Sequence, residues 1–282
     1  MGGKGKKILL TVLIVVFVAV LAWYVVLTVQ SRGSEQEYDE AKQLTEGETV
    51  EAPVEAPAEE TPAEPTAPIV TPRPTPKPTD ITYTDPVIDE LLKLDLMPLR
   101  AENPEVIGWI HIPDTIISYP IMQTADNDYY LKHSWKNTKS FAGSIFMEHQ
   151  NSADFSDFNT IIYGHNMRSE SMFGSLDKYR NAEYWQAHPY VYIVNDDGVF
   201  RYDIFAAHKV RLNTTVYGMK IDSPELREEF ISFAMDYSEL ETGIEPTIRD
   251  SLLTLSTCSG GSKNRWVVQA VKNPTECFKR EN

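Results

Sequence analysis

The sequence contains one long uninterrupted apolar segment, residues 8–29, which has neither a charge nor a proline. About 20 such residues in a helix suffice to cross the hydrocarbon core of a bilayer, so the sequence predicts a transmembrane helix at 8–29. Lys4, Lys6 and Lys7 precede the segment and acidic residues follow it, which places the basic tail, residues 1–7, in the cytoplasm. We therefore expect a single-pass protein of the cell membrane whose remaining residues are extracellular.

A cleaved secretory signal is the competing interpretation, because it also begins with basic residues and an apolar run. The apolar core of such a signal is about 7–15 residues long and is followed by a small-residue cleavage site. The run at 8–29 is longer, and no clear site of that kind follows it. The sequence favours an uncleaved anchor.

The next segment, residues 30–84, is acidic, and from about residue 46 it consists mainly of Glu, Pro, Thr and Ala. Prolines favour extended geometry and like charges repel, so this composition forms no core. We expect an extracellular linker here and a folded domain over 85–282; a proline-rich ligand for an aromatic groove is the other interpretation of the composition. The formal net charge of −15 argues against nucleic acid as a partner.

Short alternating segments dominate the folded domain. Runs of β-branched and aromatic residues bounded by turn signals predict strands at 106–112, 116–121, 143–147 and 160–163 and a hairpin at 190–206. Helical spacing and capping residues predict helices at 86–94, 172–179, 183–188 and 223–237. Many short strands with scattered helices favour one mostly-β domain, a barrel or a sandwich.

Cys258 closes an alternating strand, 254–258, and the chain has only one other cysteine, Cys277. A thiol at the end of a strand is a candidate nucleophile. The other interpretations are a buried apolar cysteine and a Cys258–Cys277 disulfide. We expect Cys277 to lie in a mobile segment near the C-terminus.

His165 and Arg265 supply the groups that a nucleophilic thiol needs. The imidazole can exchange a proton with the thiol, and the guanidinium, which stays protonated, can stabilise an oxyanion. The backbone N–H of Ser259 can complete the oxyanion hole. Alternatively, both residues have only structural roles: His165 lies in a turn, and Arg265 caps the edge of a strand.

Four short segments give the chain a resemblance to a known family. The region from about residue 103 to 272 resembles the sortases, and most closely class B, through the segments Thr254-Leu255-Ser256-Thr257-Cys258, Arg265-Trp266-Val267-Val268, Tyr163-Gly164-His165-Asn166 and Asp126-Asn127-Asp128-Tyr129-Tyr130-Leu131. The resemblance implies that His165, Cys258 and Arg265 are catalytic. It also implies groove positions at Asn127, Leu131, Ser256 and, with no motif to fix its register, Tyr217; Ser259 is the further predicted substrate contact.

The resemblance further implies an eight-stranded β-barrel with N-terminal helices and a helix between the sixth and seventh strands. The implied activity is that of a cysteine transpeptidase, which cleaves a C-terminal sorting motif of surface proteins after Thr and transfers the acyl group to an amine of a cell-wall precursor. A pilin-polymerising sortase, a surface cysteine protease and a non-catalytic binding module remain alternatives. We expect no cofactor and no metal, because no Cys/His ligand spacing is present.

Overall fold

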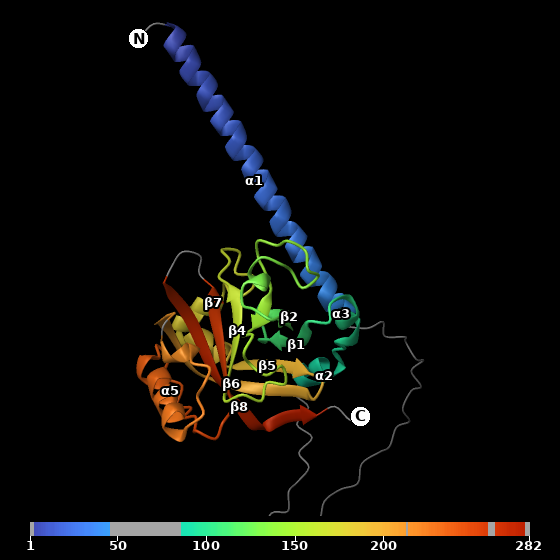
Figure 1. The fold of residues 1–282 in the computed structure, drawn as a ribbon, viewed down its shortest axis with the longest axis vertical. Helices are drawn as coiled ribbons and strands as arrows, with labels where there is room; N and C mark the ends of the chain where they lie inside the picture. Colours follow the sequence, from blue (N-terminus) through green and yellow to red (C-terminus); the bar gives the residue numbers. More distant parts are fainter. Residues whose placement is uncertain (1–2, 46–85, 213, 259–262, 280–282) are drawn as a thin grey trace, which may run out of the picture.

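The computed structural model describes residues 3–45, 86–212, 214–258 and 263–279, and at Cys258 it describes the backbone alone (Figure 1). The proline-rich part of the predicted linker and Ser259 lie outside these residues.

Eight strands close into a barrel in which the neighbours follow the order β1-β2-β3-β4-β7-β8-β6-β5. The strands are β1 Val106–His111, β2 Ser118–Met122, β3 Ile145–Met147, β4 Asn159–His165, β5 Tyr190–Asn195, β6 Gly198–Arg211, β7 Leu252–Cys258 and β8 Asn264–Lys279. The β2–β3 and β4–β7 pairs are parallel, and the others are antiparallel. This confirms the mostly-β domain expected from the residue pattern and the eight-stranded barrel that the resemblance implies.

Large apolar side chains fill the core of the domain. Those with almost no exposed surface include Trp109, Trp135, Tyr130, Tyr192, Phe173 and Phe205. Such rings remove much apolar surface from water and are the main source of the barrel's stability.

Helices cover the barrel rather than forming its core. They are α2 Pro86–Lys93, α3 Met97–Glu102, α4 Ala182–Ala187 and α5 Pro224–Tyr237, with 3-10 turns η1 Tyr129–Leu131, η2 Leu176–Arg180 and η3 Thr215–Tyr217. The expected helix between β6 and β7 is α5, which lies against β6 at the side of the barrel (Figure 1). Its predicted cap is present, since the Ser223 hydroxyl accepts a hydrogen bond from the Leu226 N–H at 3.2 Å.

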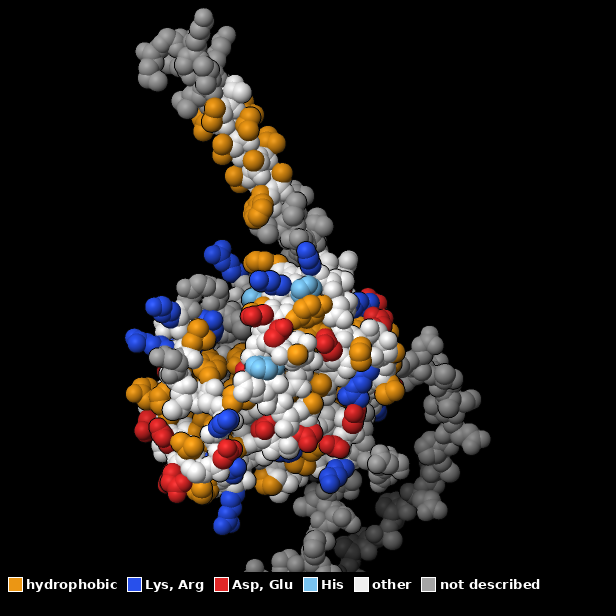
Figure 2. All heavy atoms as spheres, viewed as in Figure 1, with side chains coloured by type: hydrophobic (Ala, Val, Ile, Leu, Met, Phe, Trp, Pro, Cys, Tyr) orange, Lys and Arg blue, Asp and Glu red, His pale blue; other side chains and the backbone are white. Residues whose placement is uncertain are grey.

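A long helix, α1 Gly3–Thr45, projects from the domain (Figure 1). Apolar side chains surround its projecting part, and those described between residues 11 and 24 are all exposed (Figure 2). Within the described residues, no helix combines the length and the apolar character that a membrane span requires. The transmembrane helix at 8–29 stays a prediction.

The last turns of α1 pack on the barrel domain. Tyr38, Ala41 and Thr45, spaced to share one helix face, are all buried. The Tyr38 hydroxyl donates to the Gly143 carbonyl oxygen at 2.7 Å. The prediction of a linker from residue 30 is therefore wrong for residues 37–45, because this apolar stripe gives the segment a surface to bury.

Two other predictions differ from the structure. Residues 172–175 are not helical: Met172 has a positive φ of 54°, and the Phe173 N–H donates to the His165 carbonyl, so this segment turns beside β4. The expected mobile C-terminal segment is instead the end of β8, where Cys277 pairs with Phe200. Cys277 is a free thiol, so no disulfide joins it to Cys258.

Candidate active site

The predicted base and nucleophile lie at the ends of neighbouring strands. Strands β4 and β7 run parallel over seven paired positions, and the last pair is His165 with Cys258. Because both strands stop at this pair, the two residues meet at one end of the barrel. Backbone pairing alone thus brings together residues that are far apart in the sequence.

The imidazole of His165 is held by the chain that precedes β3. Its Nε2 lies 2.8 Å from the Leu131 carbonyl oxygen. A carbonyl oxygen only accepts hydrogen bonds, so Nε2 carries the proton and Nδ1 is the nitrogen that can take up another. The half-buried His165 ring therefore presents a defined tautomer to the end of the barrel.

Gly143 makes this arrangement sterically possible. Its φ is +59°, which favours glycine, and a Cβ at this position would lie 2.6 Å from the Tyr130 carbonyl oxygen and 3.0 Å from Cδ2 of His165. A larger residue would push the His165 ring out of place. The loop before β3 thus supports the imidazole from one side.

Arg265 is brought to the same end by the antiparallel β7–β8 pair, in which Ser256 faces Val267. At the next position, the two strands are joined through a side chain: the Trp266 N–H donates to the Thr257 hydroxyl at 3.0 Å. Extending this register by one step aligns Arg265 with Cys258. The structure thus pairs His165 with Cys258 directly and places Arg265 near the start of β8, the other neighbour of β7.

Two predicted groove residues contact one another directly. The hydroxyls of Tyr217 and Ser256 are 2.8 Å apart, and the Tyr217 ring stacks on Tyr163 with a centroid separation of 6.5 Å. Tyr163 and Ser256 are themselves paired positions of β4 and β7, two residues before His165 and Cys258. Tyr217, whose register no motif fixed, thus lies beside β4 and β7.

The other predicted groove residues come from the loop that contains η1. The Asp126 carboxylate accepts the N–H groups of Tyr129 and Asp128, both at 2.8 Å, and these bonds hold the pKa of Asp126 below its usual range. This closes the turn between Asn127 and Leu131. Leu131 is half-buried and, as described above, supplies the carbonyl that fixes His165.

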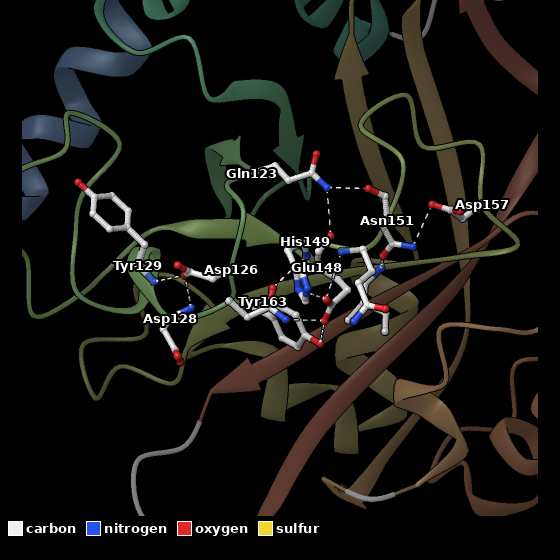
Figure 3. Close-up of polar contacts among 12 residues, drawn as sticks. Gln123, Asp126, Asp128, Tyr129, Glu148, His149, Asn151, Asp157 and Tyr163 are labelled. Atoms are coloured by element: carbon white, nitrogen blue, oxygen red, sulfur yellow. Dashed lines mark hydrogen bonds and ion pairs between the residues drawn. The ribbon is translucent and has the colours of Figure 1, made fainter.

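Sequence reasoning missed a carboxylate that holds Asn127. Glu148 is 5% exposed, and Figure 3 shows its side chain between Tyr163 and His149. Its Oε2 accepts from Asn127 Nδ2 at 2.7 Å and from the Tyr163 hydroxyl at 2.9 Å. The only sequence signal was an acidic residue directly after a strongly apolar strand, where a surface turn is the ordinary interpretation.

No metal centre accompanies these residues: the described residues contain no group of three His, Cys, Asp or Glu side chains placed to hold an ion. The residues at this end of the barrel are a histidine, an arginine and a cysteine, on the neighbouring strands β4, β8 and β7. This set suits acyl transfer through a thiol.

The comparison with protein families gives a match to the sortase domain over residues 110–273. Sortase B of Listeria monocytogenes is 38% identical over 180 residues, which cover 62% of this chain and 72% of that protein. Two solved structures of Staphylococcus aureus sortase B, a substrate complex and a complex with Gly3, are each 26% identical with a TM-score of 0.60; both cover 65% of this chain, and 84% and 85% of theirs. The chain therefore belongs to the sortase family, as a class B sortase and a cysteine transpeptidase.

Proposed function

We propose that this sortase cleaves a C-terminal sorting motif of surface proteins after threonine and transfers the acyl group to an amine of a cell-wall precursor. The observation that carries the proposal is the pairing of His165 with Cys258 at the ends of β4 and β7, with Arg265 near the start of the neighbouring strand β8. The Staphylococcus aureus complexes with substrate and with Gly3 support a peptide donor and an amine acceptor.

In the first half of the reaction, the Cys258 thiolate attacks the threonine carbonyl carbon. Arg265 and the Ser259 N–H stabilise the oxyanion, and the carbon–nitrogen bond then breaks. Protonated His165 gives its proton to the leaving amine. The products are a thioester on Cys258 and the released C-terminal tail.

In the second half, an amine attacks the thioester carbonyl and gives a proton to His165. The thiolate leaves, and a new amide bond joins donor and acceptor. Asn127, Leu131, Tyr217 and Ser256 line the donor groove beside this site. Attack by water in place of the amine is the reaction of a cysteine protease.

The location belongs to the same proposal. Residues 8–29 of α1 anchor the chain in the cell membrane with residues 1–7 in the cytoplasm, and the barrel lies outside the cell. The C-terminal end of β7 lies on the side of the barrel toward which α1 extends (Figure 1). In this orientation the active site faces the membrane, where both substrates are held.

The test offers the purified full chain a panel of fluorogenic sorting peptides, with and without triglycine. We expect one motif to be cleaved, a thioester of the peptide with Cys258 in the mass spectrum, and an amide product with triglycine. Cys258→Ala should abolish cleavage, and Arg265→Ala should lower kcat about 10²–10³-fold. A hydrolysed product that is unchanged by triglycine would identify a protease, and cleavage by Cys258→Ala would contradict the mechanism.

A further inference from the structure

Glu148 is a buried carboxylate at the edge of the proposed donor groove. It follows β3 directly, and its backbone N–H and carbonyl are fixed by hydrogen bonds with Ile161 at 2.9 Å and Gln123 at 3.1 Å. Only 5% of the residue is exposed. Removing a carboxylate from water is costly unless donors surround it, so its contacts are informative.

Both oxygens of this carboxylate have side-chain partners. Oε2 accepts from Asn127 and Tyr163, and Oε1 lies 2.6 Å from Nδ1 of His149. The amide of Asn127 is fixed from its other end too, since its Oδ1 accepts the His149 N–H at 2.9 Å. Because a carboxylate accepts and a backbone N–H donates, the two bonds define which way the amide faces.

These contacts join the loop that contains η1 to strand β4. Asn127 belongs to the loop that continues to Leu131 and the His165 contact, whereas Tyr163 lies on β4, two residues before His165. Tyr163 stacks in turn on Tyr217, which contacts Ser256. One carboxylate therefore fixes the loop against the catalytic strand.

We propose that Glu148 is a positioning residue for the acyl-donor peptide. It orients the Asn127 amide so that the second N–H of Nδ2 donates to a backbone carbonyl of the bound sorting motif, and it keeps the Asn127–Leu131 loop at its distance from β4. Glu148 acts through Asn127 and Tyr163 and does not touch the reacting atoms. This inference rests on the proposed function, in which Asn127 lines the donor groove.

The test is Glu148→Gln in the full chain, assayed with the peptide that the wild type cleaves. A neutral amide keeps the shape of the side chain but offers one acceptor oxygen in place of two. We expect KM for the peptide to rise about 10-fold or more while kcat changes less than about 3-fold, because the lost interaction concerns binding. Asp157→Asn is the matched control: Asp157 accepts from Asn151 Nδ2 at 3.0 Å in the same region (Figure 3), and its side-chain hydrogen bonds are with Asn151 and Ser152 rather than Asn127.

A double-mutant cycle separates this role from general stabilisation. If Glu148 acts through Asn127, Glu148→Gln should raise KM much less in an Asn127→Ala background than in the wild type. Equal effects in both backgrounds, an unchanged KM, or the same KM increase in Asp157→Asn would overturn the proposal. If Glu148→Gln does not fold, Tyr163→Phe tests the same network from its other side and should also raise KM.

The activity of the wild type distinguishes failure of the proposed function from failure of the positioning role of Glu148. A wild-type chain that cleaves no sorting peptide contradicts the proposed function. An active wild type with normal KM in Glu148→Gln contradicts only the positioning role.

Discussion

Burial disfavours the protonated form of two histidines in the folded protein, His111 and His208. His208 is 1% exposed, and its Nε2 lies 2.8 Å from the Gln269 side-chain oxygen, so Nε2 is the donor. Its Nδ1 is buried without a described partner, and burial lowers the pKa of His208 although the Gln269 bond opposes this. Burial and nearby Lys42 lower the pKa of His111 to about 4.

We therefore predict that stability falls as the pH drops from about 6.5 to 4. An unfolded histidine has a pKa of about 6.5, so below that pH the unfolded chain binds protons that folded His111 and His208 do not. More protons on the unfolded state mean a smaller free energy of unfolding. Thermal unfolding across this range should show Tm falling with pH, and His111→Gln should flatten the slope between pH 7 and 5. An identical slope in His111→Gln would contradict the assignment.

The positions proposed as catalytic follow from local sequence, whereas the contacts that support them do not. Cys258 and His165 each end a strand inside a short motif, so their neighbours in the sequence reveal them. Glu148 lies 21 residues from Asn127 and 15 from Tyr163, and no spacing connects them. Such a network depends on how the β3–β4 region folds back on the η1 loop, which periodicity does not encode.

Among the elements, α1 combines two different surfaces. Its projecting part exposes apolar side chains, and its last turns bury Tyr38 and Ala41 against the barrel. Trp135 Nε1 donates to the Glu37 carbonyl oxygen at 2.9 Å, and the Tyr38 ring meets Tyr119 edge-on at 5.2 Å. The end of α1 is thus part of the folded domain, and through Gly143 it contacts the loop that supports His165.

We predict that Tyr38→Ala lowers the free energy of unfolding by about 3–5 kcal/mol, the usual cost of removing a large buried ring. Denaturant unfolding of the full chain, monitored by tryptophan fluorescence, would measure the loss. Gln36→Ala, at an exposed position of the same helix, is the control and should change stability by less than about 0.5 kcal/mol. Equal stability of the two variants would mean that α1 does not stabilise the barrel.

Element prediction succeeded where the pattern was strong and local. The hairpin, the Ser223 cap and the β7 strand all carry unambiguous turn, capping or alternating residues. The helix expected at 172–179 failed because tertiary contacts of Met172 and Phe173 hold that segment as a turn. The end of β8 was missed because its stability comes from pairing with distant β6, not from its own composition.

At the scale of the whole molecule, the end of α1 and the start of α2 lie close together on the domain. Thr45 accepts the Asp95 N–H at 3.3 Å, and Thr45 and Val87 line one pocket of about 520 Å³. Residues 46–85 thus connect two helices that both pack on the barrel. The predicted anchor at 8–29 is thus joined to the domain by the continuous helix α1.

We predict that replacing residues 47–84 with about six Gly and Ser residues, which span up to ~20 Å, leaves the fold and the peptide-cleavage rate unchanged. Tm and turnover of the shortened chain would be measured beside the wild type. After reconstitution in vesicles, energy transfer from a dye on the barrel to a lipid dye should also stay the same. A clear rise in transfer efficiency would restore the interpretation of this segment as a spacer.

The continuity of α1 bears on which substrates the enzyme can reach. From the predicted membrane boundary at residue 29 to Tyr38, the first buried residue, a helix rises only about 14 Å. A continuous helix of that length would fix the distance of the barrel from the bilayer and its orientation. A flexible linker would instead let the barrel occupy many positions. Donor proteins would then be selected partly by how many residues separate their cleavage motif from the bilayer.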